Sequence, residues 1–272
     1  MLNKVILKYT DTSWVFRLTT ALILSSAIMV VPTIAYSNDL YINQVGDDLT
    51  LSITQDGEDN SIGTSSIPID LDGDDLDVTL VQETDGATIK LSIDGNNNTL
   101  VAKQKCHNGS LCNADSMDLN IVGNNNNVKA GQGYKITENG SWLYDNVEHG
   151  GHDIVLDISG HYNTVKLSQR SQNSISDHNM DVDINWDSNN VHVMQEANGD
   201  KSLDLTVNNR YNDIKIHQKK SYGHSATITI DGTYNTQLDL QQGTNNTNSA
   251  LSYTLNQYCT TPGGCAVTVL QE

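Results

Sequence analysis

Five aspartates lie close together around Gly73, and they are the residues of this sequence best suited to hold a metal ion. Closely spaced carboxylates around a glycine turn can wrap Ca²⁺ with oxygen ligands. The run lacks the bidentate Glu that closes an EF-hand loop, and there is no nonapeptide calcium repeat, so a solvated acidic loop is the other interpretation. We expect no other cofactor. The candidate calcium ligands are Asp70, Asp72, Asp74, Asp75 and Asp77.

The four cysteines form two local pairs, and each pair brackets a loop that contains glycine. Cys106 and Cys112 enclose HNGSL, and Cys259 and Cys265 enclose TTPGG. In an exported chain, a disulfide that closes each loop is the economical interpretation. A zinc site is the alternative, and it would need four ligands from two places far apart in the sequence. We therefore expect the disulfides Cys106–Cys112 and Cys259–Cys265.

Residues that could form a catalytic centre do not occur in a recognisable arrangement. There is no G-x-S-x-G, no H-E-x-x-H and no phosphate-binding glycine loop. The eight histidines scatter, apart from one pair in a glycine loop, through positions expected to be turns or outward-facing strand sites. A β-helical polysaccharide lyase or hydrolase could use the abundant carboxylates, but no pair stands out. We expect no catalytic residue and a protein that is not an enzyme.

The most regular spacing belongs to amides. In unit after unit, an apolar residue is followed five positions later by Asn and, six beyond that, by Gln. Six is an even number, so both amides point to the side of the apolar residues between them. A buried amide costs roughly 1–3 kcal/mol when unpaired, but in a stack each could donate to the identical residue one layer away. Asn alone could instead serve a turn. The predicted ladder contains Asn98, Gln104, Asn126, Gln132, Asn163, Gln169, Asn189, Gln195, Asn212, Gln218, Asn235 and Gln242.

Strands on both sides of a tight turn must position these amides. In LDLTVNNRYNDIKIHQ, from Leu203 to Gln218, apolar and polar residues alternate before and after a polar break. The register is constant within units while the loops between them vary, which indicates a solenoid. After Asn235 the pattern slips by one residue, which suggests a bulge. We expect an all-β fold, a β-solenoid of about eight stacked strand–turn–strand units in residues 38–272, with an irregular insertion at about 56–86.

Residues 1–37 are set apart from this pattern. Lys4, Lys8 and Arg17 precede an apolar run, and small residues follow near Ala35 and Ser37. This is the layout of a secretory signal peptide, so we expect a secreted protein that is not inserted in a membrane once cleaved. An uncleaved anchor is the alternative, although the apolar run is short for a membrane span. The formal net charge of −18 argues against nucleic acid as a partner.

Both ends of the repeat region resemble the curlin repeat proteins, the subunits of bacterial curli fibres, whose unit reads L-x-I-x-Q-x-G-x-x-N-x-x-x-x-x-Q. The first unit, LYINQVGDDLTLSITQ, has Ile42, Gln44, Gly46 and Gln55 at the family spacing, with Leu49 in the place of Asn. The overlapping LSITQDGEDN carries the first half in full, and the last unit, YTLNQY, has Leu-x-Gln again. The middle units retain only the Asn-to-Gln half of the pattern.

The resemblance implies export through an outer-membrane secretion machinery to the bacterial cell surface, and a role in extracellular fibres, cell adhesion and biofilm. The partners would be further copies of the chain or other curlin-like subunits, and Gln44, Gln55, Gln257 and Gln271 would be end-layer assembly residues. Long loops, many aspartates and the cysteines are unlike a major subunit and favour a minor or nucleating one. The alternatives are a monomeric surface adhesin with partner-binding loops and, more weakly, a β-helix carbohydrate-active enzyme.

Overall fold

The structure, a computed structural model, consists of β-strands and contains no helix in the part of the chain that it describes. It describes residues 3–8, 16–19, 39–56, 60–63, 68–83, 87–105, 115–133, 135–136, 142–143, 152–170, 178–196, 199–208, 210–219, 223–231, 236–243, 251–258 and 266–271.

The strands within those ranges are β1 (Asn3–Lys8), β2 (Phe16–Thr19), β3 (Asp39–Val45), β4 (Leu49–Asp56), β5 (Ser61–Ile62), β6 (Ile69–Asp72), β7 (Asp77–Glu83), β8 (Thr88–Asp94), β9 (Thr99–Lys105), β10 (Asp115–Val122), β11 (Asn127–Gln132), β12 (Lys135–Ile136), β13 (Trp142–Leu143), β14 (His152–Ser159), β15 (Thr164–Arg170), β16 (His178–Asn185), β17 (Asn190–Glu196), β18 (Lys201–Asn208), β19 (Asp213–Lys219), β20 (His224–Asp231), β21 (Gln237–Gln242), β22 (Leu251–Gln257) and β23 (Ala266–Gln271).

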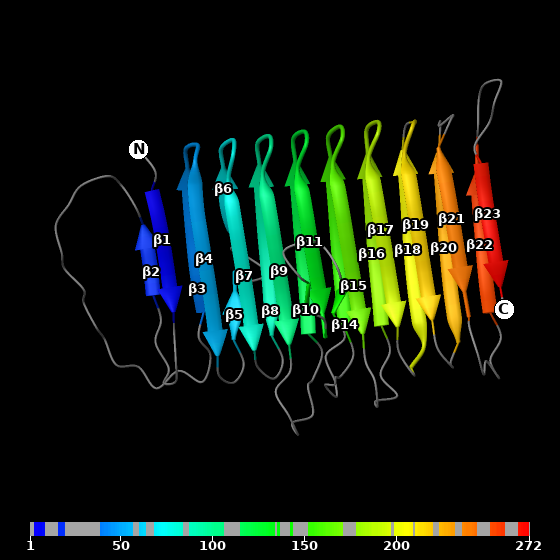
Figure 1. The fold of residues 1–272 in the computed structure, drawn as a ribbon, viewed down its shortest axis with the longest axis horizontal. Coiled ribbons are helices and arrows are strands. Elements are labelled where there is room, and N and C mark those ends of the chain that lie inside the picture. The colour runs from blue at the N-terminus through cyan, green and yellow to red at the C-terminus, as the bar shows by residue number, and fades with distance from the viewer. Residues whose placement is uncertain are drawn as a thin grey trace.

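All described strands except β12 and β13 form two parallel sheets that lie face to face along the molecule (Figure 1). β12 and β13 pair with each other in an antiparallel arrangement. The ten-stranded sheet has the order β1-β4-β7-β9-β11-β15-β17-β19-β21-β23, and the eleven-stranded sheet has the order β2-β3-β5-β8-β10-β14-β16-β18-β20-β22, with β6 between β3 and β8. A rung therefore consists of one strand of the eleven-stranded sheet, a tight turn and the following strand of the ten-stranded sheet. The rungs succeed one another in chain order, so the predicted all-β solenoid is confirmed.

Alternation along each strand builds a thin core between the two sheets. In β14 every second residue from His152 to Ile158 is buried and the residues between are exposed. The strands pair in register, so Ile121 lies directly beside Ile158, and Ile158 beside Ile184. Rows of similar aliphatic side chains run the length of the solenoid at the spacing of neighbouring strands, about 4.8 Å. Leu, Ile and Val are therefore enough to fill a core that has almost no aromatic residues.

The stretch at about 56–86, predicted to be irregular, contains a rung of its own. β6 pairs with β8, and β7 pairs with β4 and β9 in continuous register. Gln82 in β7 lies between Gln55 and Gln104. The predicted number of eight units was therefore slightly off, because this rung has Leu76 in the position of Asn98 of the next rung and escaped the alignment.

Two short strands lie within the predicted signal peptide. β1 pairs in parallel with β4, and β2 pairs in parallel with β3. The two short strands therefore lie against the rung formed by β3 and β4, which is the first rung within residues 38–272. The prediction that residues 1–37 are removed stays a prediction.

A column of glycines lets the tight turns stack. Gly95 and Gly123 have φ angles of 147° and 116°. A Cβ on Gly123 would lie 1.9 Å from the carbonyl oxygen of Gly95, which is far inside contact distance. Two positions later, Asn97 and Asn125 adopt left-handed φ angles of 60° and 58°, a conformation that Asn tolerates better than most residues. The turn sequence thus sets the close spacing of successive rungs.

Candidate functional site

A continuous ladder of glutamines runs along the inside of the ten-stranded sheet. Each carboxamide nitrogen donates to the carboxamide oxygen of the glutamine in the preceding rung. The bonds are Gln82 to Gln55 at 2.9 Å, Gln104 to Gln82 at 3.0 Å, Gln132 to Gln104 at 2.9 Å, Gln169 to Gln132 at 3.1 Å, Gln195 to Gln169 at 3.0 Å, Gln218 to Gln195 at 2.9 Å, Gln242 to Gln218 at 2.7 Å and Gln271 to Gln242 at 2.6 Å.

The same amides also bind the backbone of the opposite sheet. Gln169 Nε2 lies 2.9 Å from the carbonyl oxygen of His152 and 2.7 Å from that of Asn179, at the beginnings of β14 and β16. From Gln55 to Gln242, the ladder therefore joins the ends of strands in the ten-stranded sheet to the starts of strands in the eleven-stranded sheet. An unpaired member would leave several buried polar groups without partners, which is costly.

The asparagines form a second column, but their bonds differ from the predicted side-chain ladder. Asn126 Oδ1 accepts a hydrogen bond from the backbone N–H of Asn98 at 2.8 Å, and Asn163 Oδ1 accepts one from Asn126 N–H at 2.8 Å. Each asparagine directly follows a left-handed turn residue, and its short side chain reaches the backbone of the preceding rung. The asparagines therefore bond from rung to rung as predicted, but through the backbone instead of through a second side chain, and Asn189 and Asn212 follow the same rule. The left-handed positions belong to the residues before them.

In the unit where the pattern slips, Thr236 takes the place of the asparagine. Thr236 is fully buried, and the residue after it, Gln237, pairs with Asp213, the residue after Asn212. The additional residue therefore precedes Thr236 instead of forming a bulge within the strand. The predicted ladder residue Asn235 lies outside the described residues.

The four predicted end-layer residues fall in two different rows. Gln55 and Gln271 are the terminal members of the glutamine ladder. Gln44 pairs with Leu71, and Gln257 pairs with Ile230, so these two stand at the ends of a row that is apolar in between. Only the first and last rungs therefore carry two inward-row glutamines each, as in the family unit that they resemble.

A row of basic side chains is buried where the strands of the eleven-stranded sheet begin. His152, His178, Lys201 and His224 pair in register and are at most 1% exposed. The rings of His152 and His178 stack with centroids 4.8 Å apart and planes within 3°. The expectation that the histidines outside the glycine-loop pair occupy turns and outward positions was wrong for His178 and His224, and His152, the second histidine of that pair, is buried as well. Their spacing of two from Ile154, Met180 and Ala226 was the signal that could have placed them inside.

Burial and neighbouring charge control the protonation of this row. Desolvation, together with the ammonium group of Lys201, lowers the pKa of His224 to about 4. Lys201 Nζ donates to the carbonyl oxygen of Gly199 at 2.9 Å. We therefore expect a neutral His224 at neutral pH.

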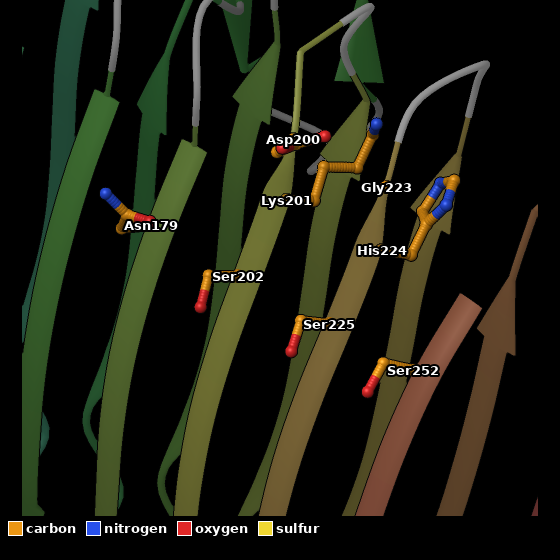
Figure 2. A pocket seen from close by; sticks show the side chains of 8 residues that line it. All are labelled: Asn179, Asp200, Lys201, Ser202, Gly223, His224, Ser225 and Ser252. Atoms are coloured by element: carbon orange, nitrogen blue, oxygen red, sulfur yellow. The ribbon is translucent and has the colours of Figure 1, made fainter. Parts of the chain in front are cut away.

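An open hollow of about 300 Å³ lies over the starts of β16, β18, β20 and β22 (Figure 2). The hydroxyl groups of Ser202, Ser225 and Ser252 form an outward row along its floor, and they point to the same side in Figure 2. Asp200 stands beside Gly223, where a Cβ would lie 2.8 Å from the Asp200 carboxylate. The hollow is open, and polar side chains of four neighbouring strands line it.

The predicted calcium ligands are spread over a whole rung. Asp70 and Asp72 belong to β6 in one sheet, and Asp77 belongs to β7 in the other. Asp74 Oδ1 accepts a hydrogen bond from the backbone N–H of Asn96 at 2.6 Å, so it caps the neighbouring turn. No group of three or more His, Cys, Asp or Glu side chains suited to a metal occurs among the described residues. Calcium binding stays a prediction, without support from this geometry.

Cys106, Cys112, Cys259 and Cys265 lie outside the described residues, so the two predicted disulfides stay predictions. No helix capable of crossing a membrane is found in the described parts of the chain. Comparisons with protein-family models, curated proteins and solved structures gave no match to this chain. The resemblance to curlin repeats rests on the sequence motifs at the two ends of the repeat region.

Proposed function

We propose that this protein is an exported structural subunit of curli-like surface fibres, in which solenoids stack end to end. The observation that carries the proposal is the exposure of inward-facing side chains in the last rung, which consists of β22 and β23. Its inward side chains continue the core rows, yet Val269 is 37% exposed while its register partner Leu240 is fully buried. Tyr253 and Leu255 are likewise only partly buried. A further rung would cover them.

The edges of both sheets favour this addition. β22 and β23 are the outermost strands of the two sheets in the described chain, so one side of each carries unpaired backbone groups. Such edges are templates for strand addition by another chain. In a heterologous, head-to-tail contact, the last rung of one copy meets the first rung of the next, which produces an open filament.

The glutamine ladder gives this contact a direction. Each glutamine donates to the glutamine of the preceding rung. At the first rung, Gln55 accepts from Gln82, and at the last rung, Gln271 donates to Gln242. In a stack, the carboxamide oxygen of Gln271 would accept from Gln55 of the next copy, and the ladder would continue across the junction.

Strands β1 and β2 occupy the edge that such a contact needs, since they pair with β4 and β3. Removal of the predicted signal peptide would therefore open the first rung. On this proposal, the chain of residues 38–272 polymerises and the chain that retains residues 1–37 does so more slowly or not at all.

The test compares both chains by thioflavin fluorescence and electron microscopy, alone and seeded with a curli subunit. In the processed chain, Val269→Lys places a charge in the exposed end row and should stop elongation. Val81→Lys is the matched control, because Val81 lies on the outer face of β7, outside the inward row that a further rung would cover. Persistent monomer in the processed chain under all conditions would contradict the proposal, as would equal elongation of the two variants.

The hollow over Ser202, Ser225 and Ser252 favours a second candidate, a monomeric surface module that binds a hydroxyl-rich or polar partner. Failure of the processed chain to polymerise, combined with retention on a carbohydrate array that Ser225→Ala abolishes, would favour this module over the fibre.

A further inference from the structure

The outer face of the eleven-stranded sheet is acidic over four consecutive rungs. From β10 to β18, its outward side chains include six aspartates and no basic residue in the described chain. Asp157 and Asp181 are exposed, and crowding by neighbouring carboxylates contributes, after burial, to a raised pKa for both. The acidic residues are Asp118, Asp153, Asp157, Asp181, Asp183 and Asp204, of which Asp118 is paired with Lys90 from β8.

The outer face of the ten-stranded sheet is basic over the same four rungs. Lys166 pairs in register with Lys129 on one side and His192 on the other, and His192 pairs with Lys215. Burial and then the nearby basic groups lower the pKa of His192 to about 4. The acidic side chains on these strands are engaged within the face: Asp213 lies 3.8 Å from Lys215, and Glu196 lies 3.8 Å from Arg170.

Neither face is explained by the stability of a single solenoid. Asp157 lies directly beside Asp183, and Asp181 lies directly beside Asp204. Like charges in directly paired positions of neighbouring strands are destabilising. The same holds for Lys129 and Lys166 on the opposite face. Two destabilising arrangements of opposite sign on opposite faces of one molecule indicate a partner that offsets both.

The two charged rows lie at the same height in the solenoid. Asp157 is three residues before the tight-turn residue Gly160, and Lys166 is three residues after Asn163, where that turn ends. In the next rung, Asp183 and His192 have the same relation to Trp186 and Asn189. A second copy that is moved sideways without rotation would therefore place its Asp157–Asp183 row over the Lys129–Lys166–His192–Lys215 row of the first.

We propose that the solenoids pair laterally, with the acidic face of the eleven-stranded sheet of one copy on the basic face of the ten-stranded sheet of a second copy. Asp157 and Asp183 are direct neighbours in the acidic row, and Lys129 and Lys166 are direct neighbours in the basic row, so both pairs have the strand spacing of about 4.8 Å. A second copy can compensate the charge of either face, because it carries both an acidic and a basic face. A polycation or a polyanion would compensate the charge of only one face. Because the contact is heterologous, each pair leaves one face of either sign open for further copies.

The contact is confined to the half of the basic face that is nearer the tight turns. The next row, which lies further from the tight turns, contains Ser168 and Met194. They are 0% and 7% exposed, so a partner cannot contact them. Lys166 and Lys215, together with Thr164 and Asn190, remain accessible. This lateral pairing is independent of the end-to-end stacking proposed above, because it uses the faces of the sheets and leaves the edges unused.

The test uses the full chain at about 0.1 M salt, where screening over about 10 Å suppresses the long-range repulsion between chains of net charge −18 but leaves contacts across the interface. Sedimentation velocity gives the association constant, and small-angle scattering gives the cross-sectional radius of gyration. Lateral pairing enlarges the cross-section and end-to-end stacking does not. We expect an enlarged cross-section that returns to the single-solenoid value at about 1 M salt, where the Debye length is about 3 Å.

Two face variants separate the partners. Asp157→Asn/Asp181→Asn/Asp183→Asn removes three of the six carboxylates of the acidic face, and Lys129→Gln/Lys166→Gln/Lys215→Gln removes the three lysines of the paired row on the basic face. Each alone should associate about tenfold or more weakly than the parent, since several charge pairs of modest strength are lost. Mixed in equal amounts, they should form a complex of two copies and nothing larger, because each variant retains only one competent face.

The matched control is Asp47→Asn/Asp48→Asn/Asp75→Asn, which changes the net charge by the same amount at the tight turns. Asn occupies the corresponding turn positions in the next rungs, at Asn96, Asn97 and Asn125, so the fold accommodates it. This variant should pair like the parent. A parent cross-section that does not depend on salt, a mixture that stays monomeric, or a control as weak as the face variants would each overturn the lateral contact.

Discussion

At the scale of single residues, the ladder glutamines and the turn glycines are the positions on which the stacking of rungs depends most. Gln169 has hydrogen-bond partners in three rungs: it donates to Gln132 and to two backbone carbonyls, and it accepts from Gln195. A glutamine side chain is long enough to reach both its counterpart and the opposite sheet, and it offers donor and acceptor groups at once. An asparagine in the same place would be too short, which is why asparagine is found at the turn.

Replacement of Gln169 by alanine should destabilise the solenoid by about 2–4 kcal/mol, because buried carbonyl and amide groups lose their partners and a cavity remains. Gln271→Ala is the matched control, since Gln271 makes one ladder bond in the last rung and is exposed. Chemical denaturation followed by circular dichroism measures both. Equal losses for the two variants would mean that the ladder contributes little beyond its packing.

Replacement of Gly123 by alanine should cost at least about 2 kcal/mol more than replacement of Gly46, because strained backbone and steric overlap add. Both glycines have positive φ angles, at 116° and 133°. Only Gly123 has a backbone atom in the way, 1.9 Å from the added Cβ, whereas the atom nearest to a Cβ on Gly46 is a flexible Gln44 nitrogen at 3.9 Å. Thermal unfolding of the two variants separates strain from overlap, and similar midpoints would refute the stacking role of the glycine column.

At the scale of elements, in-register pairing turns every residue type into a row. The same rule that aligns Ile158 with Ile184 also aligns His152 with His178 and Asp157 with Asp183. Favourable and unfavourable contacts are therefore both repeated along the solenoid. The rows of titratable groups make the stability of the sheets dependent on pH.

Acidification should destabilise the solenoid between about pH 6.5 and 4, the range between the ordinary histidine pKa and the lowered values in the fold. Burial and basic neighbours lower the pKa of His192 and His224 to about 4 each. The unfolded chain therefore takes up protons first as the pH falls, and stability is fully present only above the ordinary value. The raised pKa values of Asp157 and Asp181 act in the opposite direction, because their protonation relieves repulsion in the folded state.

The variant His224→Leu isolates one member of the basic row. Leu251 already occupies the neighbouring position in register, so the replacement suits the row. The proton uptake on unfolding, obtained from denaturation curves at several pH values, should fall by about one between pH 6.5 and 4. An unchanged pH dependence would show that His224 is not held neutral in the fold.

At the scale of the whole molecule, the solenoid is a one-dimensional stack. The last rung, β22 and β23, packs on β20 and β21 and makes no strand pairs with earlier rungs in the described chain. Stability in such arrays is approximately a sum of repeat and nearest-neighbour terms. The two open edges and the two charged faces then give the molecule separate directions in which a second copy can attach.

Deletion of residues 251–272 should leave a folded, shorter solenoid with a lower unfolding midpoint. The rung formed by β20 and β21 then becomes the end, and its inward residues Ile228 and Leu240 become exposed as Leu255 and Val269 are now. Circular dichroism should retain the β signal of the remaining rungs. Complete loss of that signal would indicate a cooperative unit that spans the whole stack, contrary to the nearest-neighbour description.

The sequence by itself determined the all-β solenoid. Two-residue alternation and the constant Asn-to-Gln distance place the apolar residues and the amides of each unit on the same face of a strand, and that face must be buried. The sequence also indicated the rows of Gln104 to Gln242, since a fixed even spacing places each glutamine on that face. Only the tertiary structure decided which atoms the asparagines bind, because the partner of Asn126 is a backbone N–H in a rung 28 residues earlier. It alone placed His152 in a buried row and Lys166 opposite Asp157 across the sandwich. Such relations depend on which rungs become neighbours, and loop lengths that vary between units hide that information from any local pattern.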